Sequence, residues 1–359
     1  MNLHKPPTPK PLFLERMKKI LKNDYENYLE ALKEQPLRSI RCNTLKISPE
    51  ALKKKLEAKN WKIKQPWKNY PEVMIIKGKF ADENLIGNEE NEEVDNATTA
   101  QKINKNYLIQ NKTLIPLEPG ELGRALEHLL GYYYIQELSS MLPVIAMNPQ
   151  ADERILDLCS APGSKTTQIS AKIKNTGTII ANEISLGRIK ILASNLERCG
   201  VTNTLITKKD GITLCKKLKK MNFYFDKILV DAPCSGEGTL RSSPKTCIMW
   251  NIKTIETLSK TQKRLFESAF EILKPNGELV YSTCTHAPEE NEEIVDRMLK
   301  EFGDSIEIIP VKLPLKTRNG ITEWEGKTYD KRVILSQRLY PQDNNTEGFF
   351  VAKFRKVKE

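Results

Sequence analysis

The chain has 359 residues, of which 57 are lysine or arginine and 46 are aspartate or glutamate, so its formal net charge is +11. This length exceeds one comfortable hydrophobic core and predicts a large domain with a smaller companion. The sequence has neither a run of about 18 apolar residues nor a charged-then-apolar leader, which argues against a membrane or secreted protein; we expect a soluble protein of the cytoplasm. The basic excess is compatible with nucleic acid as a partner, although a lysine-rich solvated surface explains it equally well.

The cysteines and histidines do not form a metal-binding pattern. There are seven cysteines and three histidines, and no two cysteines have the Cys-x-x-Cys spacing. An odd number of cysteines argues against a disulfide framework. We therefore expect free thiols and no metal site, and any reactive cysteine must be recognised by its surroundings.

The N-terminal part predicts a small α/β unit. Residues 11–35 carry apolar side chains at a helical period, residues 39–47 resemble a strand, and Ser48-Pro49 is typical of a helix start. Basic residues of this unit are candidates for contacts with a nucleic-acid phosphate backbone, although an exposed basic face without a partner fits them as well. The candidates are Arg38, Arg41 and Lys46.

A polar, acidic stretch follows this unit. From Ala81 to Lys112 the sequence is rich in Asn, Glu and Asp, a composition that buries little apolar surface. We expect a mobile loop here. The predicted N-terminal domain comprises residues 1–120, and the second domain residues 121–359.

The second domain alternates short β-rich runs with helical stretches. Alternation of this kind predicts an α/β fold with a doubly wound, mainly parallel sheet of seven strands, in which ligands bind beyond the carboxyl ends of the strands. The predicted strands are 154–159, 178–182, 204–207, 225–230, 278–282, 305–309 and 348–354. The three longest predicted helices are 186–199, 255–273 and 288–302.

The first of these strands leads into a turn of small residues that precedes a helix. Backbone amides in such a turn approach an anionic or nucleotide ligand closely, although many nucleotide-binding turns look similar. The turn comprises Cys159, Ser160, Ala161, Pro162, Gly163, Ser164 and Lys165. We expect Cys159 to be there for its small size.

Two acidic residues stand at the ends of the next two strands. Glu183 is placed to bind both hydroxyls of a ribose, and Asp210 to accept from an adenine amino group. Either acid alone is as readily a helix cap or a surface residue. Because they follow successive strands, together they predict a pocket for an adenosyl ligand, with Arg188 beside Glu183 or the ligand carboxylate.

Two cysteines stand at the ends of the fourth and fifth predicted strands. Cys234 follows the fourth strand and Cys284 the fifth, so both thiols are expected in one cleft. Each cysteine alone is more often a core residue. Their pairing beside the predicted adenosyl pocket favours a nucleophile instead.

Several segments together resemble one family, the Sun-family RNA cytosine-carbon-5 methyltransferases. The most specific are DLCSAPGSKTTQ, DAPCSGEGT, LKPNGELVYSTCT with PEENE, and RLYP with TEGFF. RSIRCNTLK and LGYYYIQELSSMLP are similar to the family's N-terminal part and its junction with the catalytic domain. The resemblance extends with gaps from about residue 12 to 356, and the order of the segments is more specific than any one of them.

The resemblance implies a Rossmann-like methyltransferase fold, S-adenosylmethionine as cofactor and RNA, preferably transfer RNA, as substrate. It implies that Cys284 attacks carbon 6 of the cytosine and that Cys234 helps to release the product. Asp231 would orient the ring together with Lys165, and Asp231 would also border the cofactor. Glu183 and Ser164 depart from the commoner aspartate and glycine of the family, which puts the ribose geometry in doubt rather than the function.

Other functions remain open from the sequence. Ribosomal RNA is an alternative substrate for the same chemistry. A DNA cytosine methyltransferase would use Cys234 as its nucleophile, and a scaffold that binds RNA without turnover would use neither cysteine. The intact Cys284 disfavours the last two.

Overall fold

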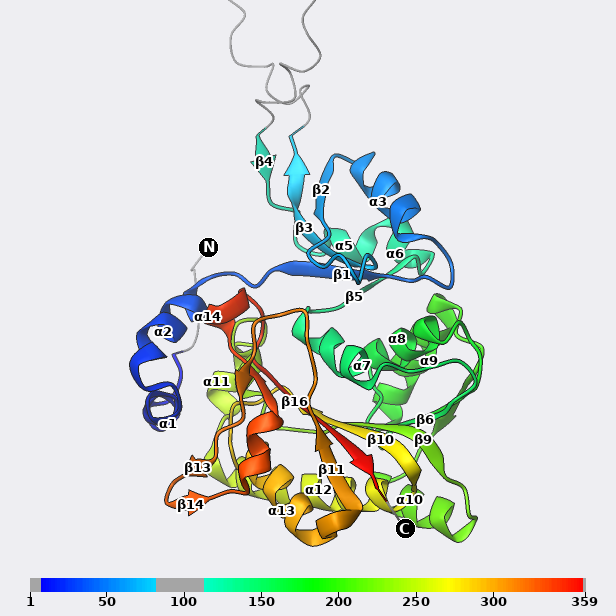
Figure 1. Ribbon diagram of the computed structural model, residues 1–359. Helices are drawn as coiled ribbons and strands as arrows, with labels where there is room; N and C mark the ends of the chain where they lie inside the picture. The colour runs from blue at the N-terminus through cyan, green and yellow to red at the C-terminus, as the bar shows by residue number, and fades with distance from the viewer. Residues whose placement is uncertain (1–7, 82–112, 358–359) are drawn as a thin grey trace, which may run out of the picture.

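The computed structural model describes residues 8–81 and 113–357 (Figure 1). Apart from Ala81, the predicted mobile loop lies outside the described residues. A large α/β domain lies below a small antiparallel sheet in this view. No helix in the described part combines the length and apolar character needed to cross a bilayer.

The large domain is built on one mixed sheet of nine strands, which confirms the predicted α/β class. Its order is β12-β15-β16-β10-β9-β6-β7-β8, with β11 paired to β16. The strands from β10 to β8 are parallel, whereas β16 lies antiparallel to β10, β11 and β15. The seven predicted strands are present, and the short strands β15 (Gln337–Leu339) and β12 (Arg318–Asn319) extend the sheet.

The central strands are buried on both faces. They are β6 (Arg154–Asp157), β7 (Thr178–Asn182), β9 (Phe225–Asp231) and β10 (Leu273–Thr283). Apolar residues of α7 (Leu142–Met147) and α8 (Ser164–Lys172) pack on one face, and those of α10 (Gly211–Lys220), α12 (Ile252–Glu271) and α13 (Glu292–Phe302) on the other. Helix α9 (Leu186–Cys199) packs against the α8 side and ends at Gly200, as predicted.

The strand order reverses between β6 and β9. From β6 the chain proceeds to β7 and β8 (Thr204–Thr207) on one side, whereas β9, β10 and β16 (Phe349–Lys356) lie on the other. Ligands of doubly wound sheets bind at such a reversal, outside the carboxyl ends of the strands. The topology therefore directs attention to the residues that follow β6 and β9.

The small sheet has five antiparallel strands. They are β1 (Arg38–Cys42), β2 (Trp61–Lys64), β3 (Val73–Phe80), β4 (Leu114–Ile115) and β5 (Tyr133–Ile135). Because β5 pairs with β1, the predicted boundary at residue 120 falls inside this unit, which extends to Ile135. Helix α3 (Pro49–Glu57) begins as predicted, with the Ser48 hydroxyl accepting from the Ala51 amide.

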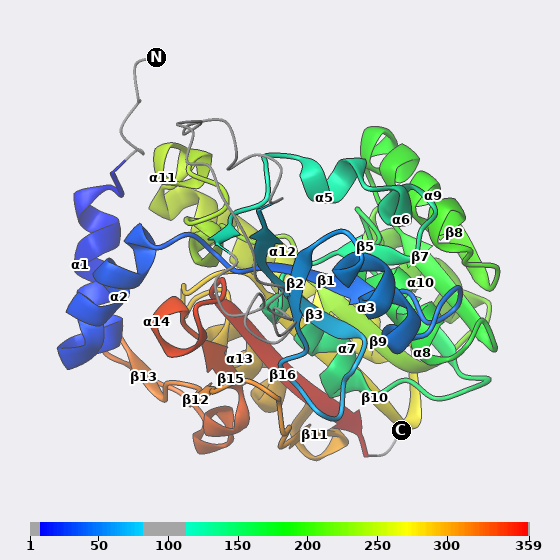
Figure 2. The ribbon, with the colours of Figure 1, turned by 90° about the horizontal axis from the view of Figure 1, so that it is seen from above.

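The first predicted helix is divided and belongs with the large domain. It consists of α1 (Pro11–Leu21) and α2 (Tyr25–Lys33), separated where Lys22 adopts a positive φ. Phe13 and Met17 of α1 and Tyr28 of α2 share a core with Trp250 and Tyr340. Figure 2 accordingly shows both helices on the flank of the large domain, away from the small sheet.

Candidate active site

A cavity of about 330 Å³ opens at the reversal of strand order. It is lined from one end by residues after β6, β7 and β8 and from the other by residues after β9 and β10. The lining includes Cys159, Ala161, Glu183, Arg188, Asp210, Asp231, Cys234 and Cys284. We call it the first cavity; it brings the predicted adenosyl-binding acids and both predicted cysteines into one space.

Glu183 is fixed at the end of β7. Its side chain is buried, accepts the Ser185 amide at 2.9 Å and pairs with Arg188 at 3.1 Å. Arg188 also donates to the carbonyl of Ala161 at 2.5 Å, which ties the small-residue turn to the carboxylate. A held carboxylate of this kind suits the two hydroxyls of a ribose.

Asp210 has a structural bond as well as a place in the first cavity. One carboxylate oxygen accepts the amide and hydroxyl of Thr213, each at 2.9 Å, and so caps α10. The capping role that the sequence left open is therefore present together with the cavity position. The donor and acceptor set of Glu183, Arg188 and Asp210 fits an adenosyl ligand.

The two cysteine sulfurs are in contact. Cys234 Sγ lies 3.1 Å from Cys284 Sγ, and the Cys284 amide donates to Cys234 Sγ at 3.3 Å. Their strands are neighbours in register, since Ser282 of β10 pairs with Asp231 of β9. The hydrogen bond with Cys284, together with burial, raises the pKa of Cys234 well above its usual value. Cys234 therefore retains its proton, and its thiol stands ready to donate to the neighbouring sulfur.

A second cavity, of about 240 Å³, meets the first at Cys284. The two share Asp231, Ala232 and Cys284 in their linings. The second cavity is also lined by Glu137, Ser139, Ser140, Lys165, Thr239, Ser242, Glu347 and Phe349. Cys284 therefore lies between the two cavities, and Glu183 and Asp210, the acids predicted to bind an adenosyl group, line only the first.

Lys165 and Asp231 form an ion pair at the boundary of the cavities. The Lys165 ammonium lies 2.7 Å from Asp231 and also donates to the Ser140 hydroxyl at 3.1 Å. The other oxygen of Asp231 accepts the Ser282 hydroxyl at 2.7 Å. Both side chains are therefore held in one orientation before any ligand arrives.

Two glycines, Gly238 and Gly348, allow their segments to approach the Cys284 loop closely. The Gly238 amide donates to the Cys284 carbonyl at 2.8 Å, and the Gly348 amide donates to the Gly238 carbonyl at 2.9 Å. A Cβ on Gly348 would lie 2.2 Å from the His286 ring, and one on Gly238 would lie 2.2 Å from the Gly348 carbonyl oxygen. Side chains at these positions are excluded by space, which explains the glycines of SGEGT and TEGFF.

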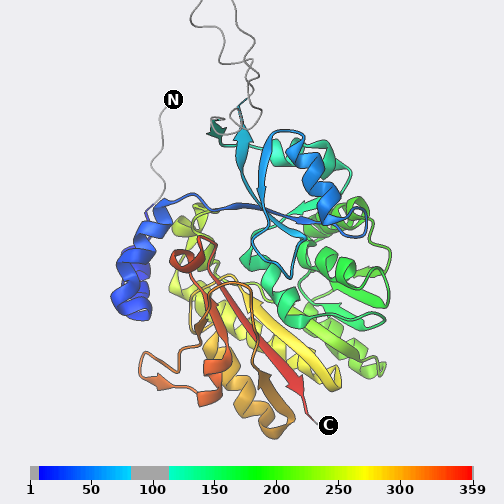
Figure 3. The ribbon, with the colours of Figure 1, turned by 45° about the horizontal axis from the view of Figure 1, so that its top comes forward.

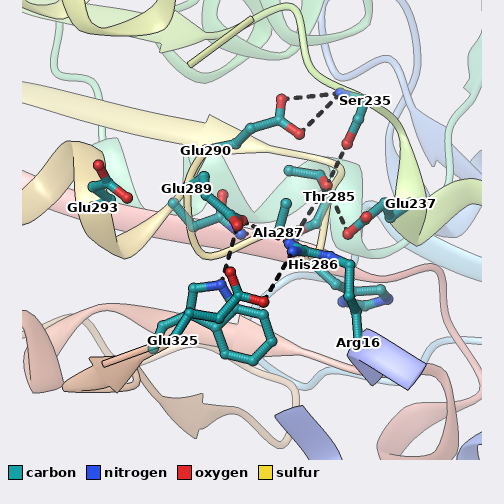
Figure 4. A network of polar contacts seen from close by, with 12 residues as sticks. Arg16, Ser235, Glu237, Thr285, His286, Ala287, Glu289, Glu290, Glu293 and Glu325 are labelled. Atoms are coloured by element: carbon teal, nitrogen blue, oxygen red, sulfur yellow. Dashed lines mark hydrogen bonds and ion pairs between the residues drawn. The ribbon is translucent and has the colours of Figure 1, made fainter. Parts of the chain in front are cut away.

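A buried polar network supports the two cysteine loops (Figure 4). Glu290 accepts the Ser235 amide at 3.0 Å, and the Ser235 and Thr285 hydroxyls are 2.7 Å apart. Thr285 in turn donates to Glu237 at 3.2 Å. Burial raises the pKa of Glu290 to about 7. The loop after Cys234 and the loop after Cys284 are therefore joined by side chains as well as by strand pairing.

The three residues predicted to contact RNA lie in different environments. Arg41 is buried and donates to the Ser164 carbonyl at 2.7 Å and to Thr167 at 2.8 Å, so it joins the small sheet to α8 and does not reach phosphate. The prediction for Arg41 is corrected accordingly. Arg38 donates to the Leu117 carbonyl at 2.7 Å, and exposed Lys46 donates to two carbonyls, so for these two phosphate contact stays a prediction.

Sequence reasoning identified Asp231 but missed two other carboxylates of the second cavity, Glu137 and Glu347. Glu137 accepts the amides of Ser139 and Glu347, at 2.7 and 3.1 Å, and is thus fully engaged within the protein. Glu347 lines the cavity from the segment before β16. Both stand in segments quoted for the family resemblance, LGYYYIQELSSMLP and TEGFF, but no local pattern separates them from surface acids.

A model of one protein family matches residues 144–355, and its description is 16S rRNA methyltransferase RsmB/F. A second model, the N-terminal domain of 16S rRNA methyltransferase RsmF, matches residues 9–70. Together they cover α1 to β2 and nearly the whole large domain.

Named relatives and solved structures agree with these matches. Ribosomal RNA small subunit methyltransferase F of Vibrio campbellii is 36% identical over 96% of the chain, which spans 63% of that relative's length. The tRNA (cytosine(49)-C(5))-methyltransferase of Pyrococcus abyssi is 45% identical over 65% of the chain and 73% of its own length. A methyltransferase homolog from Pyrococcus horikoshii, 31% identical, superposes with a TM-score of 0.75 over 97% of this chain and 95% of its own. NSun6 from the same organism, crystallised with SFG, is 26% identical with a TM-score of 0.74 over 98% and 99%.

Proposed function

Because the chain belongs to the RsmB/F family of methyltransferases, we propose that it transfers a methyl group from S-adenosylmethionine to carbon 5 of a cytosine in RNA. The observation that carries the proposal is the contact of two cysteine sulfurs at the junction of two cavities, one suited to an adenosyl group and the other free for a base. A relative crystallised with SFG supports a nucleoside-type ligand in this fold.

The cofactor is held by the first cavity in this proposal. Glu183 binds the ribose hydroxyls, Asp210 accepts from the adenine amino group, and the turn after β6 reaches the cavity with Cys159 and Ala161. S-adenosylmethionine supplies the methyl group. The chain's own residues fix its position beside Cys284.

Cys284 is the nucleophile. Carbon 5 of cytosine is too weak a nucleophile to take a methyl group unaided, and a sulfur bonded to carbon 6 raises its electron density. Cys284 lines both cavities whereas Cys234 lines only the first, so Cys284 is the sulfur that reaches a base held in the second cavity. This favours Cys284 over Cys234 as the attacking group and so disfavours the DNA-type alternative.

Three further residues, Lys165, Asp231 and Cys234, assist the attack of Cys284 and the release of the product. The ammonium of Lys165, held by Asp231, donates to the ring carbonyl and draws electron density from carbon 6 as the sulfur attacks. In release, water takes the proton from carbon 5 while the bond between carbon 6 and Cys284 Sγ breaks, and the Cys234 thiol, 3.1 Å away, stabilises the departing sulfur by S–H donation. The target base must leave its stack to reach the second cavity, so we expect a loop or flexible element of RNA.

Two RNA classes are candidates for the substrate. The match of residues 9–70 to the N-terminal domain of RsmF favours small-subunit ribosomal RNA, which we propose to test first. Transfer RNA, the preference from sequence, is the second candidate because a tRNA cytosine methyltransferase is 45% identical over 65% of the chain. Activity on either RNA would place the protein in the cytoplasm.

The test uses the full chain with S-adenosylmethionine labelled in its methyl group. We expect label in ribosomal or transfer RNA, and bisulfite sequencing of the labelled RNA then gives the position. Label in DNA would support the Cys234-type alternative. Label in none of the three substrates would contradict the proposal and favour an RNA-binding scaffold.

A further inference from the structure

Three carboxylates line the second cavity, and two of them are already engaged. Asp231 accepts Ser282 on one oxygen and pairs with Lys165 through the other. Glu137 accepts the Ser139 and Ser140 amides on one oxygen and the Glu347 amide on the other. The hydrogen-bonding oxygens of Asp231 and Glu137 are therefore already used to hold the walls of the second cavity together.

The third carboxylate, Glu347, is different. Its side chain is 4% exposed, and among the described residues neither of its oxygens has a hydrogen-bond partner. A buried polar group without a partner is costly, and a ligand that provides a donor removes the cost. Ser242 lies nearby without reaching hydrogen-bond geometry.

The position of Glu347 is set by its backbone. Its amide donates to Glu137, and the next amide, that of Gly348, donates to Gly238, which in turn is bonded to the Cys284 carbonyl. Two backbone hydrogen bonds, from Gly348 to Gly238 and from Gly238 to Cys284, therefore connect the segment of Glu347 to that of Cys284. The backbone of Glu347 is therefore fixed relative to the nucleophile.

The lining of the second cavity also carries a cation. Lys165 presents its ammonium at the boundary with the first cavity, where a ring carbonyl can accept from it. A base held between Lys165 and Glu347 must therefore show an acceptor on one edge and a donor on the other. Cytosine does so, with its O2 carbonyl and its N4 amino group, whereas uracil shows a carbonyl at both positions.

We propose that Glu347 is the specificity-determining residue of the second cavity, whose carboxylate accepts the N4 amino group of cytosine and rejects the O4 carbonyl of uracil. The inference rests on the proposed function and deepens it, since it assigns base selection to a residue other than Lys165 and Asp231. An acceptor-only group discriminates strongly here because the wrong base leaves two acceptors facing each other in a buried site.

The test is the variant Glu347→Gln, whose amide presents both a donor and an acceptor and so suits either base. Once the methylated cytosine is mapped, transcripts are made with 5-fluorocytidine or 5-fluorouridine at that position. Fluorine on carbon 5 blocks release, so each base that reacts leaves a protein–RNA adduct on a denaturing gel. Assays run at pH 8 because burial raises the pKa of Glu347 to about 7.

We expect the parent to trap 5-fluorocytidine RNA and the variant to raise the ratio of 5-fluorouridine to 5-fluorocytidine adduct by about 10- to 100-fold. Glu347→Asp keeps an acceptor-only carboxylate and should keep the preference, although it reacts more slowly. Equal losses of Glu347→Gln on both RNAs, or an unchanged ratio, would overturn the inference in favour of a structural role. If the parent methylates no RNA, the mapping step fails first and the proposed function falls with the inference.

Discussion

The first and second cavities meet at Cys284 but are built in different ways. Most of the first is lined by residues 158–211, which follow three consecutive strands. The second takes its lining from residues 137–140, 165, 231–242, 284 and 347–349, segments that only the completed sheet and small unit bring together. A pocket formed by the ends of successive strands can be predicted from local sequence patterns. A pocket formed by segments remote in sequence depends on tertiary packing and cannot be predicted in this way.

The difference also appears in how each cavity is secured. Glu183 is held by a neighbour two residues away and by Arg188 on the following helix. The cysteine loops and Glu347 are held by bonds across more than fifty residues of sequence, as between Ser235 and Glu290 or Glu347 and Glu137. Figure 3 shows the strands that bring these loops together, β10 and β16, lying side by side below the small sheet. Substitutions should therefore separate cofactor binding from reaction with the base.

Cys284→Ala should break the reaction while sparing the first cavity. We expect methyl transfer to fall at least about 10⁴-fold, because the covalent step loses its nucleophile. The affinity for S-adenosylmethionine, measured by calorimetry, should stay within about twofold, since the acids that bind it are untouched. Cys247→Ala, a buried cysteine outside both cavities, is the matched control and should retain activity. Transfer at the parent's rate by Cys284→Ala would refute the assignment.

Cys234→Ala should uncouple the two halves of the reaction. Cys284 remains to attack, so methylation proceeds once, but release of the product slows by about 10²- to 10⁴-fold without the neighbouring thiol. A protein–RNA adduct should then accumulate on a denaturing gel with unmodified RNA. If no adduct forms although single-turnover methylation persists, Cys234 has no part in release.

Glu183→Gln tests the first cavity alone. The amide accepts less strongly than a carboxylate and loses the pairing with Arg188, so the dissociation constant of S-adenosylmethionine should rise about 10-fold. At saturating cofactor the rate should approach that of the parent, because the second cavity is unchanged. Exposed Glu197→Gln on α9 is the control. A fall in the saturated rate with unchanged affinity would mean that the two cavities are not separable in this way.

These contrasts show what the sequence can and cannot predict. The bounds of strands β7 and β8 and of helix α9 agree with the prediction at both ends. In each of them the apolar run ends at polar residues or at a glycine. Glu183, Cys234 and Cys284 were found because each follows such a strand. Their neighbourhood in space followed from the rule that carboxyl ends of parallel strands share an edge.

Other features depend on contacts that no local pattern reveals. Arg41 was predicted to bind phosphate because it is basic, yet three protein acceptors bury it at the junction with α8. The break at Lys22 leaves the apolar period of residues 11–35 almost unchanged, so the sequence suggested one helix. Glu347 is one acidic residue among 46 Asp and Glu until the fold places it in the lining of the cavity that Cys284 borders.

Glu290→Gln should change the dependence of stability on pH, with the smallest effect of these variants. Burial raises the folded-state pKa of Glu290 from 4.5 to about 7, so the ionised form is disfavoured by the fold. The parent therefore has its full stability from this group below pH 4.5 and loses it as the pH rises through 7. Glutamine resembles the neutral acid at every pH, so the variant should equal the parent near pH 4 and exceed it at pH 8, by on the order of 2 kcal/mol in the free energy of unfolding. Urea titrations at the two pH values measure this, with exposed Glu256→Gln as control. A variant less stable than the parent at pH 8 would mean that the ionised carboxylate, accepting Ser235 and Gln262, holds the cysteine loops more strongly than burial opposes it.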